Sequence, residues 1–312
     1  MWVILAAIAP NFLLILLGWG IRVRRWLDAS FWVQTEKLTY YLLFPALLVA
    51  NLAEAKLDGL PVAAIIGAQG LGLVGVLALV VLPLRLVWPR LATDGAVFTS
   101  FFQGSVRPNT YIGFAMASAL WGANGVTVTA LAAALVIPLV NLVCVIALIR
   151  WGEGDHQRGL GPTLWAIARN PLILACLIGA ALNVSGLGLP PVIGPVLKIM
   201  AQASLALGLL CVGAGLEFSA IRGAGSVVGA TLVVKLAVVP AAVAALAWWF
   251  GLSGSQLAAT IAYAALPVAT NSYVLARQLG GDARLAAAII TTSTIAAAAT
   301  LPVAAMLIAR LP

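Results

Sequence analysis

Long apolar runs are the feature that most constrains this chain. Nearly its whole length consists of apolar stretches of about 20 residues, the length at which a helix crosses a hydrocarbon core of about 30 Å. Hydrophobic residues make up 63% of the sequence and charged residues only 8%, against about 25% charged in a typical soluble domain. The alternating segments of about 10 residues typical of a transmembrane barrel do not occur. The sequence therefore predicts an all-α integral membrane protein.

The apolar runs predict ten transmembrane helices. All ten Trp residues lie near a predicted end, where amphipathic rings prefer the membrane interface. The predicted spans are residues 2–22, 34–53, 61–88, 95–121, 124–150, 163–184, 190–216, 224–250, 255–280 and 283–309.

Basic residues are distributed unequally between the two sides of these spans. Twelve lie on the side reached after odd-numbered spans, namely Arg22, Arg24, Arg25, Lys37, Arg85, Arg90, Arg150, Arg158, Arg169, Arg222, Arg277 and Arg284. Three lie on the opposite side: Lys56, Lys198 and Arg310. Because basic residues favour the cytoplasm, we expect both termini to face outward. The net charge of +8 is thus a topology signal and gives no reason to expect a nucleic-acid partner.

The two halves of the chain resemble each other. Pro10 and Gly18 recur 161 residues later as Pro171 and Gly179, and Lys37 recurs at the same offset as Lys198. The sequence therefore predicts a first five-helix repeat over residues 1–150, a cytoplasmic linker over 151–162 and a second repeat over 163–312. Because five is odd, the second repeat enters the bilayer upside down, which gives two inverted five-helix repeats.

Two predicted spans, the fourth and the ninth, are interrupted. Pro108 and Pro267 each remove a backbone donor near mid-span, and the segments Asn109–Thr110–Tyr111 and Asn271–Ser272–Tyr273 follow them. Each break is expected to begin a new half-helix, capped by polar side chains and with its positive dipole end near the bilayer centre. If the inverted repeats bring the two starts together, they form an anion site from backbone and side-chain donors.

The charges inside the predicted spans favour an anion over a cation. Arg107 and Lys235 are the two basic residues within spans, whereas all nine acidic residues lie in loops or near span ends. A buried charge costs at least about 2.5–3.5 kcal/mol at the bilayer centre, so each should face a polar cavity or a partner. Two purely structural roles stay open. Lys235 could extend toward the interface, and Arg107 could bond the free carbonyls of the first half-helix.

Other polar residues are weaker candidates. Asn51 could line the cavity, or it could bond a neighbouring helix. Cys144, Cys176 and Cys211 lie in apolar runs and indicate buried small side chains, with no metal or cofactor. The single histidine, His156, lies in the predicted linker, which argues against a membrane-embedded acyl- or prenyl-transferase. A cation/proton antiporter on a similar broken-helix fold is the main alternative, and it would need a deep acidic residue. A passive channel is a further alternative.

The pattern of these motifs resembles the auxin efflux carrier family, which includes plant PIN-type carriers and bacterial malonate or malate carriers. The resemblance is carried by three segments: residues 107–113, Lys235 with Pro240, and residues 265–272. It implies a bile-acid symporter-like fold and a homodimer. Spans one, two, six and seven would form a scaffold, and the other six an elevator-type transport domain. It also implies a carboxylate substrate at the crossover of spans four and nine, where the family's prolines and asparagines map to Pro108, Asn109, Pro267 and Asn271.

These observations predict a secondary transporter, not an enzyme, for a small organic carboxylate that is auxin-like or a dicarboxylate. The expected binding residues are Asn109, Thr110, Asn271 and Ser272, with Arg107 and Lys235 tuning the local potential. Lys235 is also the candidate for proton coupling.

Overall fold

Most helices of the computed structural model overlap the predicted apolar spans, whereas the short helices at 89–93 and 218–221 lie between them. The model describes residues 2–55, 60–153, 169–222 and 225–308. Most of the predicted linker, the start of the span at 163–184, and the residues Lys56, His156, Arg158 and Arg310 lie outside the described residues. Within those residues all regular structure is helical, apart from one isolated β-bridge.

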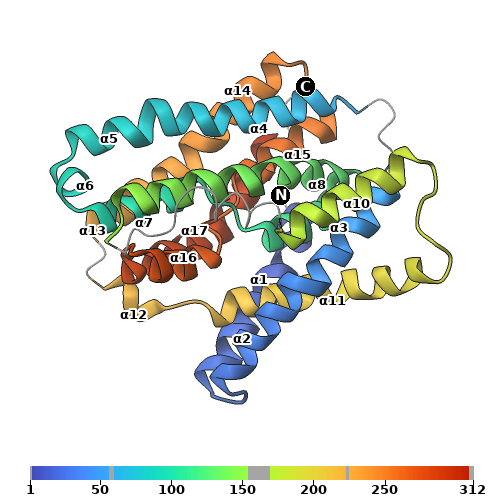
Figure 1. Ribbon diagram of the computed structural model, residues 1–312, viewed down its shortest axis with the longest axis horizontal. Helices are drawn as coiled ribbons and strands as arrows, with labels where there is room; N and C mark the ends of the chain where they lie inside the picture. Colours follow the sequence, from blue (N-terminus) through green and yellow to red (C-terminus); the bar gives the residue numbers. More distant parts are fainter. Residues whose placement is uncertain (1, 56–59, 154–168, 223–224, 309–312) are drawn as a thin grey trace.

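The first part of the chain contributes the helices that carry the first break (Figure 1). They are α1 (Trp2–Val23), α2 (Ala29–Leu38), the π-helical turn η1 (Thr39–Leu43), α3 (Phe44–Ala53), α4 (Val62–Val76), the π-helical turn η2 (Leu77–Val81), α5 (Leu82–Val87), α6 (Pro89–Thr93), α7 (Gly95–Val106) and α8 (Thr110–Trp151).

The second part contributes the helices that carry the second break. They are α10 (Pro171–Val184), α11 (Ile193–Ala214), α12 (Phe218–Ile221), α13 (Gly225–Val233), the π-helical turn η3 (Val234–Val238), α14 (Val239–Trp249), α15 (Gly254–Ala264), α16 (Asn271–Leu279) and α17 (Ala283–Ile308).

Six helical stretches of the described chain are long and apolar enough to cross a membrane: Ala6–Val23, Val62–Val87, Thr110–Trp151, Ile193–Ala214, Gly225–Trp249 and Ala283–Ile308. These helices fit an integral membrane protein. The stretch at 110–151 contains two helices joined by a kink at Gly122, whose positive φ of 57° favours glycine, where the predicted spans 95–121 and 124–150 adjoin. The ten-span count and the inversion of the two halves stay predictions.

Three of the prolines within the apolar helical stretches follow widened turns. Each of the three π-helical turns ends two residues before a proline, at Pro45, Pro83 and Pro240. A proline ring inside a regular helix clashes with the carbonyl one turn earlier, and a π turn relieves that clash by shifting the bonding pattern by one residue. The helices thus continue past these prolines, whereas Pro108 and Pro267 lie in non-helical segments.

Helices from the first and second parts of the chain pack closely on each other. α1 lies along α11, and α3 lies along α10 and α11, while α4 packs on α14 and α8 on α15. The α1–α11 contact brings backbones together: a Cβ on Gly18 would collide with the carbonyl of Leu210, and one on Gly213 with that of Ile15. At the same contact, Arg22 donates to the carbonyl of Ala214 and to Glu217.

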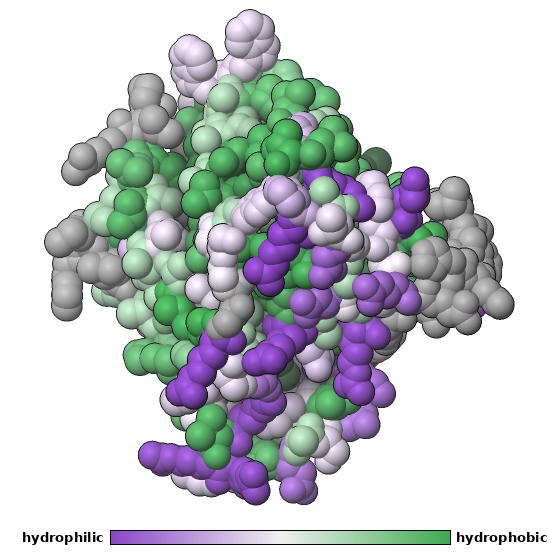
Figure 2. Space-filling view, turned by 90° about the vertical axis from the view of Figure 1, so that its left-hand side faces the viewer, coloured by the Kyte–Doolittle hydropathy of each residue, from purple (hydrophilic) through white to green (hydrophobic). Residues whose placement is uncertain are grey.

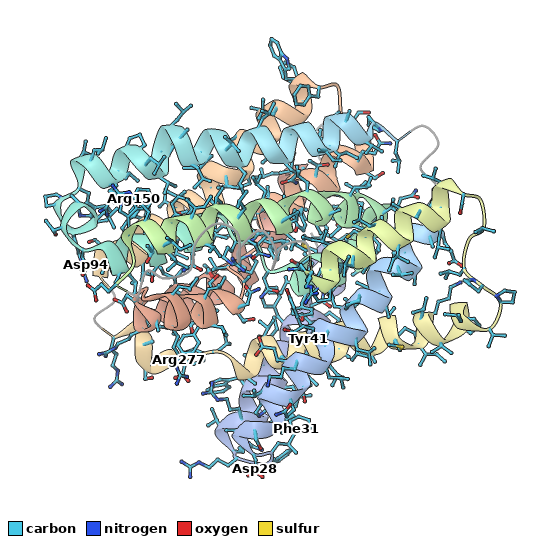
Figure 3. All side chains as sticks on the ribbon, in the orientation of Figure 1. Asp28, Phe31, Tyr41, Asp94, Arg150 and Arg277 are labelled. Atoms are coloured by element: carbon cyan, nitrogen blue, oxygen red, sulfur yellow. The ribbon has the colours of Figure 1, made fainter. Side chains whose placement is uncertain are left out.

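Charged side chains gather at one end of the helices. Figure 2, which views the molecule from that end, shows hydrophilic residues across the middle of the surface, with apolar surface beside them. In Figure 3 the labelled Arg150 and Arg277 lie at this end, together with Asp94. Both arginines belong to the side that the sequence predicts to be cytoplasmic.

Candidate functional site

The two predicted breaks exist, and they lie side by side. α7 ends at Val106 and α8 begins at Thr110, while α15 ends at Ala264 and α16 begins at Asn271. The segments between them form an antiparallel β-bridge between Pro108 and Val268. The two segments lie about 160 residues apart in the sequence, and each supplies hydrogen-bond partners to backbone groups that the break in the other helix leaves unpaired.

Two backbone hydrogen bonds hold this crossover. The N–H of Asn109 donates to the carbonyl of Pro267 at 2.8 Å, and the N–H of Ala269 donates to the carbonyl of Arg107 at 3.1 Å. Neither bond needs the N–H that a proline lacks, because the donors are the N–H groups of Asn109 and Ala269. A third bond runs from the Val268 N–H to the Ser293 hydroxyl of α17, at 3.1 Å.

The first break caps its new helix as predicted. The Asn109 side-chain oxygen accepts the Ile112 N–H at 3.4 Å, and Thr110 is the first residue of α8. Asn109 is 1% exposed, and its amide nitrogen has no hydrogen-bond partner. A buried donor is therefore left beside the N-terminus of α8.

The second break begins its helix differently. Thr270 occupies the cap position of α16 and makes no side-chain capping bond, so Asn271 is already helical. The side-chain oxygen of Asn271 and the hydroxyl of Ser272 are buried without a hydrogen-bond partner. This break thus presents uncommitted polar atoms where the first break has a cap.

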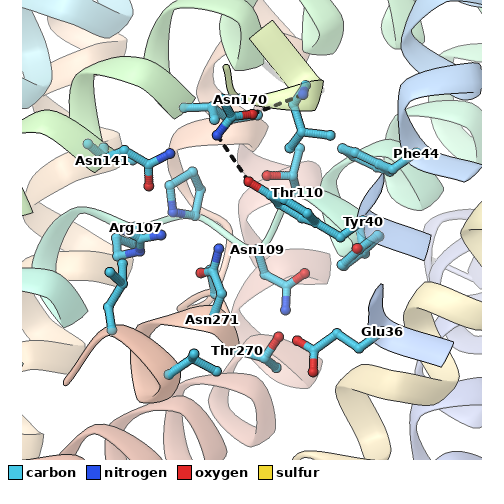
Figure 4. Close-up of a pocket in the computed structure, with 18 of the residues that line it drawn as sticks. Glu36, Tyr40, Phe44, Arg107, Asn109, Thr110, Asn141, Asn170, Thr270 and Asn271 are labelled. Atoms are coloured by element: carbon cyan, nitrogen blue, oxygen red, sulfur yellow. Dashed lines mark hydrogen bonds between the residues drawn. The ribbon is translucent and has the colours of Figure 1, made fainter. Parts of the chain in front are cut away.

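A cavity of about 740 Å³ adjoins both breaks. One wall comes from the breaks themselves and α16, another from α2, η1 and α3, and a third from α8 and the start of α10. The lining residues are Val33, Glu36, Lys37, Tyr40, Tyr41, Phe44, Arg107, Pro108, Asn109, Thr110, Tyr111, Ile137, Val140, Asn141, Val145, Asn170, Leu172, Ala269, Thr270, Asn271, Val274, Leu275 and Leu279. Figure 4 shows the amides of Asn109, Asn141 and Asn271 grouped with Arg107 in this space.

Arg107 is the deep charge of the cavity. Its side chain lines the cavity but is only 3% exposed, and its Nε and Nη1 have no hydrogen-bond partner. No acidic side chain of the described residues lies within salt-bridge distance of it. A buried cation without a counter-ion is strongly unfavourable, so this position favours a bound anion.

The Asn170–Tyr40 pair fixes hydrogen-bond directions at the cavity wall. The Asn170 side-chain oxygen accepts the Leu172 N–H at 2.9 Å, which makes its amide nitrogen the donor to the Tyr40 hydroxyl at 3.0 Å. Since the Tyr40 oxygen accepts, its own proton is available to a ligand. The dashed lines in Figure 4 mark both bonds.

Three residues expected at the site lie outside the cavity lining. Lys235 is 1% exposed and donates from Nζ to the Ala264 carbonyl at 2.9 Å, where α15 ends. Asn51 is not among the lining residues, and its side-chain amide donates to the Leu47 carbonyl of its own helix at 2.7 Å. Ser272 is 2% exposed and also does not line the cavity. The carbonyl-bonding role considered for Arg107 thus belongs to Lys235, at the other break.

Sequence reasoning missed several polar residues of the cavity, among them Glu36, Tyr40, Asn141 and Asn170. Two had a usable signal, because Asn170 directly precedes Pro171, the pattern of a helix cap, and Asn141 follows Pro138 by three residues within an apolar span. Glu36 was placed at a span end, but α2 begins at Ala29 and carries it along the cavity wall.

Metal-binding side chains are not grouped in the part of the chain that the structure describes: no three His, Cys, Asp or Glu residues lie together there. The polar groups that line the cavity are amides, hydroxyls, the Arg107 guanidinium, the Lys37 ammonium and the Glu36 carboxylate. The guanidinium, amide and hydroxyl groups can donate hydrogen bonds to a carboxylate or another oxyanion.

A comparison with family models identifies the chain from its sequence. The model described as membrane transport protein, which is the auxin efflux carrier family, matches residues 3–305. The chain belongs to this family. It is therefore a multi-pass membrane transporter, in agreement with its apolar helices. Curated proteins give no match to it.

Proposed function

We propose that this transporter is a secondary carrier for small organic anions and that a carboxylate binds beside Arg107. The observation that carries the proposal is the unpaired guanidinium in the cavity at the crossover. Folding an arginine into this position costs several kcal/mol unless a partner compensates it, and a carboxylate can accept two parallel N–H bonds from a guanidinium. A transient partner that arrives and leaves is what a carrier requires.

The helix starts at the crossover support the same ligand. α8 and α16 begin with Thr110 and Asn271, both in the cavity lining. The first N–H groups of a helix carry partial positive charge and favour anions. The amide nitrogen of Asn109 adds a buried donor without a partner. Backbone, amide and guanidinium thus all supply donors to one region.

The position of the cavity fits an alternating-access mechanism. It lies between the breaks on one side and α2, η1, α3 and α10 on the other. In our proposal α1, α3, α10 and α11 belong to a scaffold that forms a homodimer, and the helices around the breaks move as an elevator. The ten-span inverted repeat with outward termini in a bacterial inner membrane is part of the same proposal. Because the lining includes Lys37 and Leu279 from the predicted cytoplasmic side, the structure would be inward-facing.

The cation/proton antiporter is a weaker alternative. Glu36 is the one acidic residue among the described lining residues, so it is the only group there that could neutralise a bound cation. Arg107 lies in the same cavity and would repel that cation. The balance of charges therefore favours the anion carrier.

Counterflow in proteoliposomes tests the proposal. Vesicles loaded with an unlabelled carboxylate should concentrate the labelled one, which a passive channel cannot do. Arg107→Gln should lower uptake at least roughly 30-fold, because losing one partner of a buried charge pair costs about 2 kcal/mol or more. Arg277→Gln removes the same charge from an exposed site on α16 and should leave uptake unchanged. Equal uptake by wild type and Arg107→Gln would refute the assignment.

A further inference from the structure

The cavity carries a negative charge on the wall opposite Arg107. Glu36 of α2 lines the cavity, and Figure 4 shows its carboxylate directed inward, toward Thr270 and Asn109. It is half-buried, and within the described residues it takes part in neither of the two ion pairs, Arg22–Glu217 and Lys198–Glu54. The same space thus has an unpaired cation at one side and an unpaired anion at the other.

This arrangement discriminates between classes of carboxylate. A dicarboxylate that docks one group at Arg107 would bring its second negative charge into a cavity that already contains Glu36. Lys37 also lines the cavity, but its side chain is exposed, where solvent weakens its attraction. A simple monocarboxylate would compensate Arg107 and leave Glu36 unpaired next to its apolar body.

The other lining residues indicate what the uncharged part of the ligand is like. Apolar and aromatic side chains line the same cavity, among them Val33, Tyr41, Phe44, Ile137 and Val140. The Tyr40 hydroxyl adds one donor, since Asn170 already occupies its oxygen as an acceptor. Such a cavity fits a compact molecule with a hydrophobic part and two charged groups.

We propose that the transported molecule is a zwitterion: an amino carboxylate with an apolar spacer between its two charged groups, whose carboxylate meets Arg107 and whose ammonium meets Glu36. This inference rests on the proposed carboxylate carrier and names its substrate class. A zwitterion compensates both unpaired charges of the cavity at once and brings no net charge with it. Both protein groups are then satisfied in the loaded state, which neither a dicarboxylate nor a monocarboxylate achieves.

Matched ligands provide the test. Binding to the purified full-length protein in detergent micelles is measured by calorimetry near neutral pH. The probes are 6-aminohexanoate and trans-4-(aminomethyl)cyclohexanecarboxylate, their deaminated forms hexanoate and trans-4-methylcyclohexanecarboxylate, and the dicarboxylate adipate. We expect each amino acid to bind at least tenfold more tightly than its deaminated form, and adipate to bind most weakly.

Variants assign the preference to Glu36. Glu36→Gln should abolish the preference for the amino acids and leave the deaminated forms bound as well as before. Glu54→Gln is the matched control, because Glu54 pairs with the exposed Lys198 at 2.8 Å and does not line the cavity. It should leave all affinities unchanged.

The possible failures are distinguishable. If the deaminated forms or adipate bind as tightly as the amino acids or more tightly, or if Glu36→Gln leaves the ratio unchanged, the zwitterion is refuted and the carboxylate carrier stands. If no carboxylate-bearing probe binds at all, the proposed function fails as well, and with it this inference.

Discussion

The two broken helices have the same backbone design but use their polar groups differently. Both contain a proline in an extended segment, and each gives the other one backbone hydrogen bond. The first break contains its own cation, Arg107, and its own cap, Asn109. The second contains no charge and takes its support from other helices: Lys235 bonds the carbonyl of Ala264, and Ser293 accepts the N–H of Val268.

This difference separates binding from support. A cation at bilayer depth must find a partner, and a free helix-end carbonyl is one such partner. Lys235 has that partner at 2.9 Å, whereas Nε and Nη1 of Arg107 have none. Depth and charge alone therefore do not mark a binding residue. A cation marks a binding residue when its hydrogen-bond donors have no partner within the protein.

The largest expected effect comes from removing each of the two buried cations in turn. Lys235→Met should leave carboxylate affinity within about threefold of the wild type, since the ammonium group bonds the protein and does not line the cavity. Arg107→Met should weaken affinity by about 2–5 kcal/mol, the cost of truncating one partner of a buried charge pair. Calorimetric titration of both variants measures the contrast. A Lys235→Met variant that has lost binding, beside an Arg107→Met variant that has kept it, would reverse our assignment.

A smaller effect is expected from the serine that supports the second break. Ser293 and Ser105 are both fully buried, and both donate to carbonyls of their own helices. Only Ser293 also accepts a backbone N–H, from Val268. Ser293→Ala should therefore lower the free energy of unfolding by about 1–3 kcal/mol, and Ser105→Ala by about 0.5–1.5 kcal/mol. Denaturation in mixed micelles measures both, and a larger loss for Ser105→Ala would contradict the support that we assign to Ser293.

The smallest effect separates the two asparagines. Asn109→Ala removes a helix cap and should cost about 0.5–2 kcal/mol in the ligand-free protein. Asn271→Ala removes a side-chain oxygen that bonds nothing and should cost less than about 0.5 kcal/mol. The same denaturation assay compares them. Equal costs would mean that the two breaks are held in the same way.

The sequence was sufficient to predict the breaks because proline acts locally. Pro108 and Pro267 lack a donor whatever surrounds them, and Asn109 follows as a suitable cap. The proximity of the two breaks in space could also be predicted, since the matching motifs in the two halves indicate a shared pocket.

The partners of the charged residues could not be predicted, because they depend on geometry between distant helices. The π-helical turn at 234–238 contains Lys235, and the Ala264 carbonyl that it bonds lies 29 residues further along the chain. Periodicity shows neither the turn nor this contact. Glu36 escapes prediction for a related reason: the apolar run begins at residue 34, whereas the helix begins at Ala29 and extends the cavity wall.

A crystal structure of the protein with bound 3-(4-bromophenyl)propionate tests the central claim most directly, because anomalous scattering locates the bromine independently of the protein. We predict the bromine inside the cavity and the carboxylate oxygens about 2.7–2.9 Å from nitrogens of Arg107. A carboxylate bound beside Lys235, or a bromine site outside the crossover cavity, would contradict our account.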